Sequence, residues 1–506
     1  MRLVKRMRSK AISIPLFVCD PADAGRGVTA MKLASHPPSV NSLVDKENTS
    51  WYFYCRPKKD EHQEGACNEG FIVRRSRHSR RQTICLAARG KARRVFLPFR
   101  ERAEGSRRHE GARPAMGLPT PHQLRGAVRM SVFSTGAAAA ISPEEYEQAF
   151  VEDERYFNFA SLGPVSEPVV ATGERLLRAT ATARPNDAAM IAAQVPRALA
   201  VLSRLSGFPE GNITLVSNTS SALVQVALGL PSGTSVISGR YQFPANVWPW
   251  RNAAETGRIA LRLAGTLDEP VTPELLHAHL DAQCDAVAMS HVDFRTGYRA
   301  DLTRIREAIG DRLLIVDAIQ AFGAVEEDWT LADVVIAGGQ KWMRAGQGTG
   351  FMALSDRALD RIRPLAANWG GIGDSLDIRR DDQKPRPGAG RFDPTRPSPV
   401  LAGCLAQALE LVEGVGLDWI ASRIQQRYER LADNAAGRGL RLLSDWPAEQ
   451  RAGIAVIEAA GATAVNRLID AGFTVTIHDT NRVRASLHAT TRIAAIDELV
   501  EVLAGH

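Results

Sequence analysis

Two polar side chains follow short apolar runs in the second half of the chain. The run at 313–316 (LLIV) ends in Asp317, and the run at 334–337 (VVIA) leads through two glycines and a glutamine to Lys341. Such runs predict buried parallel strands, whose carboxyl ends deliver side chains to one edge of a sheet. A solvated surface lysine is not expected beside glycines at the end of a buried strand. We therefore expect Asp317 and Lys341 to meet in a cleft.

A lysine and a carboxylate in one cleft suit pyridoxal 5'-phosphate (PLP) especially well. This cofactor needs a lysine for its Schiff base and an acid against its pyridine nitrogen, which keeps the ring an electron sink. The pattern predicts that Lys341 carries the cofactor and is the catalytic acid and base, and that Asp317 keeps the pyridine nitrogen protonated.

Three motifs around these residues carry a family resemblance. They are DAIQ from Asp317, GGQKW with its lysine 24 residues after that aspartate, and a glycine-rich GQGTGF. Together they resemble the class V aminotransferase group of fold type I PLP enzymes, which includes cysteine desulfurases, selenocysteine lyases, kynureninases and isopenicillin N epimerase-like proteins. The resemblance runs from about residue 156 to the C-terminus and identifies the cofactor better than the reaction.

The resemblance implies an α/β fold, PLP-dependent transferase fold type I. A large domain is built on a mostly parallel seven-stranded sheet, and a small α+β domain follows. The alternation of strands and helices along the chain favours the same parallel sheet. The local sequence also predicts a capping box at Ser142, a strand over 156–164 and helices over about 188–206 and 302–309. We expect the large domain, with an N-terminal segment, at 130–395 and the small domain at 396–506.

The resemblance also assigns residues around the cofactor. Gln320 should contact the phenolic oxygen of PLP, and Phe243 stands where desulfurases have a histidine that stacks on the ring. Ser220 and Ser221 stand where the phosphate-binding loop often has two threonines, and Gln340 should also bind the phosphate. From the residues alone, a plain helix N-cap at Asn218–Ser221 and a core role for Phe243 remain open.

Two arginines complete the expected site. Arg396 in RFDPTRPSP stands where the family has a threonine that reaches the phosphate of the neighbouring subunit. If Arg396 takes this role, the active site is shared between subunits and the enzyme is a homodimer. The alternative is that Arg396 is a surface arginine on a proline-rich linker. Arg484 in RVRASLHATT matches the arginine that grips the substrate carboxylate, ideally through two parallel hydrogen bonds.

One desulfurase feature is missing. The segment GFTVTIHDTNRVR, which ends in Arg484, has no cysteine where that branch carries its catalytic thiol, and Cys404 in an apolar helix is a poor substitute. Since the thiolate is the nucleophile, a desulfurase of the usual persulfide mechanism is not expected. Gln340 and Gly338 also replace a histidine and a serine of that branch, so the phosphate site is rebuilt.

The charge is unevenly distributed. Residues 1–129 hold 27 Lys and Arg against 11 Asp and Glu, whereas the whole chain has 63 against 56. This basic, Arg-rich segment shows no sustained periodicity and predicts a disordered extension, which either is not part of the working protein or binds acidic surfaces. Without a CxxC motif or a long apolar run, we expect no metal site, no disulfide framework, no membrane span and a cytoplasmic location.

The first expectation for function is an enzyme that removes the Cα proton of a small amino acid, as a transaminase or a lyase of C–S or related bonds. A kynureninase-like hydrolase is the alternative, suggested by Phe243-Pro244. From another class, a PLP-binding or nucleic-acid-binding regulator would use the basic segment, although nucleic acid is not the expected partner.

Overall fold

The computed structural model describes residues 138–505 and five earlier strands. These strands, which pair antiparallel in chain order, belong to a compact unit, Met1–Gly126, distinct from Ala127–His506. The rest of the basic segment lies outside the described residues, so its predicted disorder stays a prediction. The strands are β1 (Val40–Asp45), β2 (Ser50–Cys55), β3 (Phe71–Arg74), β4 (Thr83–Ala88) and β5 (Lys91–Phe96).

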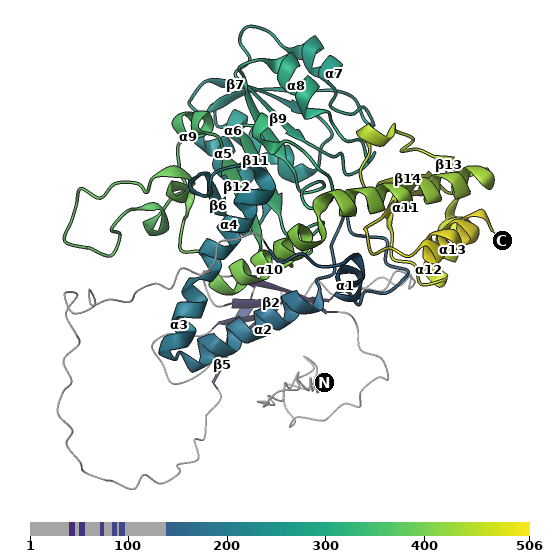
Figure 1. Cartoon of the computed structure of the whole chain (residues 1–506). Coiled ribbons are helices and arrows are strands. Elements are labelled where there is room, and N and C mark those ends of the chain that lie inside the picture. The colour runs from purple at the N-terminus through teal and green to yellow at the C-terminus, as the bar shows by residue number, and fades with distance from the viewer. Residues whose placement is uncertain are drawn as a thin grey trace, which may run out of the picture. The chain divides into compact units, whose positions relative to one another are not determined.

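A seven-stranded sheet organises the second unit (Figure 1). Its order is β6-β12-β11-β10-β9-β7-β8, and β12 is its one antiparallel strand. The prediction of a mostly parallel seven-stranded sheet is therefore confirmed. Its strands are β6 (Ile213–Leu215), β7 (Thr234–Gly239), β8 (Ile259–Ala264), β9 (Ala286–Ser290), β10 (Leu313–Asp317), β11 (Val334–Gly338) and β12 (Gly350–Leu354).

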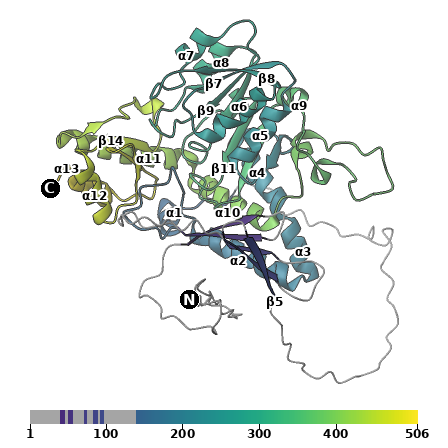
Figure 2. The same ribbon diagram turned by 180° about the vertical axis from the view of Figure 1, so that it is seen from behind.

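Both faces of this sheet are buried, which explains why its central strands are almost entirely apolar up to their carboxyl ends. In β10, Leu314 and Val316 join one hydrophobic cluster, whereas Leu313 and Ile315 join the cluster on the opposite face. Figures 1 and 2 show the helices that cover the two faces. They include α2 (Glu167–Thr182), α4 (Gln194–Ser206), α7 (Pro273–His279), α8 (Leu302–Ile309) and α10 (Pro399–Val415) with the first cluster, and α5 (Thr219–Gly229), α6 (Trp248–Glu255) and α9 (Asp356–Arg361) with the second.

A smaller antiparallel sheet lies near the C-terminus, in the order β13-β14-β16-β15. Its two faces also differ. Val456 of β14 packs with the main core, whereas Ile457 beside it packs with the helices of the small domain. The elements are α11 (Leu417–Gly437), β13 (Arg441–Leu442), β14 (Ile454–Glu458), α12 (Ala462–Asp470), β15 (Thr476–His478), β16 (Arg482–Ser486) and α13 (Ile493–Ala504).

The N-terminal part of this unit differs from the sequence prediction in two places. The predicted capping box at Ser142 opens α1 (Pro143–Gln148), as expected. However, the segment 156–164 forms only single bridges, through Tyr156 and Asn158, and is not a strand of either sheet. The single helix expected over 188–206 is divided into α3 (Pro185–Ala192) and α4, because Pro196 lacks the N–H that would bond the carbonyl of Ala192.

In the described part of the chain, one stretch, α3 and α4 taken together, is long and apolar enough to cross a membrane. The helices α10 and α11 meet the same criteria of length and hydropathy only as a pair, and this pair is bent by 79°. Both arginines of the α3–α4 stretch pair with acidic residues of α10: Arg197 Nε donates to Glu410 at 2.6 Å, and Arg204 Nε donates to Glu413 at 2.5 Å. Packing against α10 accounts for the apolar face of α4, and we do not assign it to a membrane.

Candidate active site

The sheet brings Asp317 and Lys341 to the same edge. Asp317 is the last residue of β10, and Lys341 lies in the turn after the neighbouring β11. The side chains are 2% and 8% exposed, and within residues 138–505 no ion pair joins them. The two groups are close enough for their charges to affect each other, although they form no ion pair.

Burial shifts the pKa of both groups toward neutrality. It raises the pKa of Asp317 to about 6, against the opposing effects of the Ile319 N–H and of Lys341. It also lowers the pKa of Lys341 to about 8, although the charge of Asp317 acts in the other direction. Lys341 is thus close to the neutral form that a nucleophile or a base needs.

Three segments hold the lysine turn in place. Gly338 N donates to Thr219 Oγ1 at 2.9 Å, and Gly163 N donates to Gln340 O at 2.8 Å. A Cβ at position 163 would lie 2.0 Å from the carbonyl oxygen of Lys341, so only glycine fits there. The N-terminal segment, α5 and β11 therefore fix the backbone of Lys341 together.

Gln320 lies in the site with most of its amide already engaged. Its Nε2 donates to Ala160 O at 2.9 Å, and its Oε1 accepts from Trp342 Nε1 at 2.8 Å. The amide has one further N–H to offer, so the predicted contact with the phenolic oxygen of PLP is compatible with the structure and stays a prediction.

Phe243 covers the lysine. Its ring lies 5.5 Å from Lys341 Nζ and is 45% exposed, which argues against the alternative that it is a core residue. Beneath it lies a buried polar network that sequence reasoning missed. Gln242 Nε2 donates to Ser238 Oγ at 2.9 Å, and Asn246 Oδ1 accepts from Trp250 Nε1 at 3.1 Å. This network fixes the loop that presents Phe243.

The predicted phosphate ligands divide into two groups. Ser220 and Ser221 lie in the first turn of α5, where Asn218 caps Ser221 N at 2.8 Å, so the N-cap alternative is correct for Asn218. Gln340 lies beside this turn, since its side chain and that of Thr219 both approach Gly338. If Gly338 carried a Cβ, that atom would lie 2.4 Å from Gln340 Oε1 and 3.2 Å from Thr219 Oγ1. A helix N-terminus with nearby polar groups suits a phosphate.

Arg396 does not reach this turn within one chain. It is exposed, and its guanidinium lies 5.5 Å from the centre of the Trp369 ring. Its proposed reach into a partner's site stays a prediction.

Arg484 is buried in the middle of β16, and it has no acidic partner within residues 138–505. It is 4% exposed, and it donates to Phe294 O at 2.9 Å, Ser161 Oγ at 2.7 Å and Thr476 Oγ1 at 3.0 Å. Its Nε has no partner among the described residues. Burial lowers the pKa of Arg484 to about 10, which still leaves it cationic at neutral pH. A buried cation held by neutral acceptors is a site for an anion.

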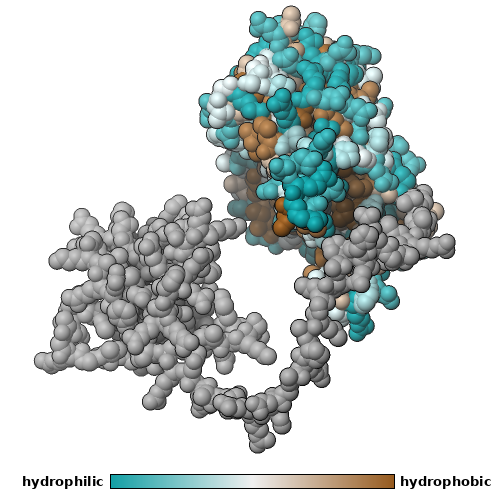
Figure 3. All heavy atoms as spheres, turned by 90° about the vertical axis from the view of Figure 1, so that its left-hand side faces the viewer, coloured by the Kyte–Doolittle hydropathy of each residue, from teal (hydrophilic) through white to brown (hydrophobic). Residues whose placement is uncertain are grey.

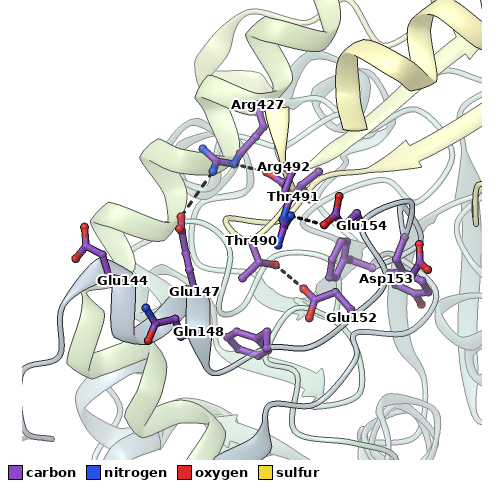
Figure 4. Close-up of a pocket in the computed structure, with 13 residues that line it drawn as sticks. Glu144, Glu147, Gln148, Glu152, Asp153, Glu154, Arg427, Thr490, Thr491 and Arg492 are labelled. Atoms are coloured by element: carbon purple, nitrogen blue, oxygen red, sulfur yellow. Dashed lines mark hydrogen bonds and ion pairs between the residues drawn. The ribbon is translucent and has the colours of Figure 1, made fainter. Parts of the chain in front are cut away.

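A separate cavity does not contain these residues. About 360 Å³ in volume, it is lined mainly by acidic side chains of the N-terminal segment and by Arg427, Thr490 and Arg492 (Figure 4). It meets the lysine turn through Arg344, whose buried guanidinium donates to Glu152 at 2.6 Å and to Thr490 at 3.0 Å. We regard the Lys341 edge as the active site, because the perturbed groups and the unpartnered cation lie there.

Comparison with known proteins agrees with this geometry. A family model described as Aminotransferase class-V matches residues 182–478, more than half of the chain. The chain belongs to the class V aminotransferase family. It is therefore a PLP-dependent enzyme, and the resemblance of DAIQ and GGQKW to this family is confirmed.

Among similar proteins of this family is kynureninase of Deinococcus radiodurans, 29% identical over 206 residues, or 40% of this chain and 48% of that protein. Serine–glyoxylate aminotransferase of Methylorubrum extorquens is 26% identical over 270 residues, or 48% and 63%. The chain thus spans about half the length of the curated relatives it matches. A solved structure of a C-DES variant, with glycine covalently linked to its PLP cofactor, shares the fold with a TM-score of 0.66 at 19% identity, covering 72% of this chain and all of that one.

The residues present fit PLP. Asp317 offers a buried carboxylate that has one oxygen without a hydrogen bond among the described residues, the buried Lys341 lies near it, and the first turn of α5 contacts the lysine turn through Thr219. In this family member Lys341 would hold the aldehyde carbon, Asp317 the pyridine nitrogen and the α5 turn the phosphate. When bound, PLP supplies an electron sink for the bonds of an attached amino acid.

Proposed function

We propose that this enzyme acts on a small amino acid by removing its Cα proton, as a transaminase or as a lyase that cleaves a C–S or related bond. The supporting observation is Arg484, a buried guanidinium whose acceptors are all neutral and whose Nε has no partner among the described residues. A substrate carboxylate would give this cation its missing counter-ion and accept two parallel hydrogen bonds.

The residues take distinct parts in this proposal. Arg484 binds and orients the carboxylate, while Ser161 and Thr476 hold the guanidinium in position. Lys341 accepts the Cα proton at Nζ, for which its lowered pKa prepares it. Asp317 holds a proton at the pyridine nitrogen, Gln320 donates to the phenolic oxygen and Phe243 covers the ring and excludes water. Ser220, Ser221 and Gln340 bind the phosphate.

A persulfide-forming desulfurase is not our proposal, although desulfurases share the fold. The support is that the two described cysteines, Cys284 and Cys404, are buried or partly buried, and burial raises the pKa of both thiols. Such thiols are poor nucleophiles. A kynureninase-like hydrolase is the second candidate, favoured by Phe243-Pro244 and by the similarity to kynureninase.

A homodimer that shares its sites is part of the proposal. Large apolar side chains are exposed among the described residues, including Trp369 at 40%, whose ring lies beside Arg396, and Ile378 at 91%. Figure 3, which looks at the side from which the green loop after α9 projects in Figure 1, shows hydrophobic side chains on both sides of a hydrophilic projection. A second copy would cover such a surface and bring its Arg396 to the phosphate. The domain boundary at 395/396 and a cytoplasmic location stay proposals as well.

The test begins with the full chain loaded with PLP. L-amino acids are screened for a change in the cofactor absorption band and for release of keto acid, ammonia or sulfide. We expect at least one small amino acid to react, and Arg484→Gln to raise its KM by about tenfold or more, since a charged hydrogen bond is lost. Arg441→Gln, which alters an exposed arginine of the same sheet, is the control. If Arg484→Gln binds and turns over amino acids as well as the wild type, the proposed role is wrong.

A further inference from the structure

The short strand β15 places a histidine on the same face as the substrate arginine. In the β15–β16 pairing Thr476 lies opposite Arg484, and His478 lies opposite Arg482. Side chains two residues apart on a strand share a face, so His478 is the diagonal neighbour of Arg484, at about 7–8 Å. This face of the sheet is turned toward the main core, as the packing of Val456 opposite Arg484 shows.

Aromatic contacts connect His478 with the catalytic lysine. The His478 ring packs edge-on against Phe294 at 6.0 Å between centres, and Phe294 packs against Phe243 at 5.2 Å. Phe243 in turn lies 5.5 Å from Lys341 Nζ, and the Phe294 carbonyl accepts from Arg484. His478, Phe294 and Phe243 therefore form a row of rings that runs from beside Arg484 to Lys341.

The His478 ring has a nitrogen without a partner. Its Nε2 is shielded from solvent and bonds to no group among the described residues. The side chains of the nearby Arg295 and Arg482 are engaged elsewhere, because both pair with Asp268. A buried ring nitrogen without a hydrogen bond is costly, which points to a ligand atom that completes it.

We propose that His478 is a specificity-determining residue that hydrogen-bonds, through Nε2, to a neutral polar group on Cβ or Cγ of the amino-acid substrate. This inference rests on the proposed function, in which Arg484 binds the carboxylate of the same substrate.

The environment of His478 favours a neutral partner over a charged one. Burial lowers the pKa of His478, and the charges of Arg484 and Arg295 lower it further, so the imidazole is neutral at pH 7. A neutral imidazole offers one donor and one acceptor. It therefore selects a hydroxyl, thiol or amide side chain, such as that of serine, cysteine or asparagine, over an apolar side chain of equal size.

The test is a spectral titration of the PLP-loaded full chain, which reports amino-acid binding without requiring turnover. The probes are two pairs of similar size, L-serine against L-alanine and L-asparagine against L-leucine. We expect the wild type to prefer the polar member of each pair about fivefold to tenfold, as one net hydrogen bond allows. His478→Phe should abolish the preference and change alanine binding by less than about twofold, and His478→Gln should restore part of it.

The control is His277→Phe, which alters an exposed histidine of α7 and should keep the wild-type preference. Equal preference in wild type and His478→Phe would overturn the role of His478. An equal loss of serine and alanine binding in His478→Phe would also overturn it, because the residue would then be structural. If no amino acid changes the wild-type spectrum, the proposed function fails and the inference fails with it.

Discussion

Replacing Asp317 by asparagine should stabilise the apoprotein while it weakens the enzyme. Asp317 is 2% exposed, and burial raises its pKa from 3.8 to about 6. The difference of about two pKa units, at about 1.4 kcal/mol per unit, corresponds to a cost of about 3 kcal/mol for the ionised carboxylate. Asparagine has the same shape and can still accept from Ile319 N, but it has no charge to bury.

The difference in stability between the wild type and Asp317→Asn should depend on pH. Below about pH 4 the carboxyl is protonated in both states, so wild type and Asp317→Asn should be equally stable. Between about pH 4 and 6 the unfolded state ionises first, and the wild type loses stability as the pH rises. At pH 7 the variant should therefore be more stable by about 3 kcal/mol, measured by urea unfolding of PLP-free protein at a series of pH values.

The control carboxylate should behave in the opposite way. Burial alone would raise the pKa of Asp333, but the hydrogen bonds of Arg357, Leu314 N and Arg306 outweigh it and lower the pKa. Asp333→Asn should thus destabilise the protein at neutral pH, and the loss should shrink as the pH falls. Added PLP should stabilise the wild type more than Asp317→Asn. A variant Asp317→Asn that is less stable than wild type at pH 7, or equally shifted at every pH, would refute the reasoning.

Two further predictions concern the lysine turn. Because the pKa of Lys341 is about 8, the rate of PLP uptake by the apoprotein should rise with pH and level off above about pH 8. Stopped-flow absorbance measures this rate, and a rise that continues to pH 10 would indicate a lysine with an ordinary pKa. Arg344→Met should destabilise the protein by about 3–5 kcal/mol, since it leaves Glu152 without the cation that neutralises it. Urea unfolding measures this loss, with Arg379→Met, a change at an exposed arginine, as the control. A loss of stability below about 1 kcal/mol in Arg344→Met would contradict the prediction.

The main strands and the reacting pair were predictable because they obey local rules. Apolar runs that end at Asp317 and before Lys341 indicate buried parallel strands, and the strand pairing aligns their ends. The helix α8 was predicted with its observed bounds, since Asp301 caps it and Gly310 ends it. Phe243, Gln320 and Arg484 were identified through the family resemblance and not from periodicity.

The supporting residues could not be predicted, because they come from distant parts of the chain. Ser161 accepts a hydrogen bond from the Arg484 guanidinium, although the two residues are 323 positions apart in the sequence. Nothing in the local sequence around either residue marks that contact. The network of Gln242 and Asn246 looks like an ordinary polar loop until it is buried beneath Phe243. The strand expected at 156–164 does not form, because its apolar residues pack in two different hydrophobic clusters and its backbone makes only single bridges, to Thr474 and Ser486.

The central claim is that Lys341 carries PLP. The sequence makes this simple to test, since Lys384 is the only other lysine in residues 130–506. The full chain is incubated with PLP, reduced with sodium borohydride to fix any lysine adduct, digested and mapped by mass spectrometry. We predict that the pyridoxyl group is found on Lys341, that Lys384→Ala leaves it there, and that Lys341→Ala abolishes it. Modification of Lys384 or of N-terminal lysines instead, or none at all, would contradict the account.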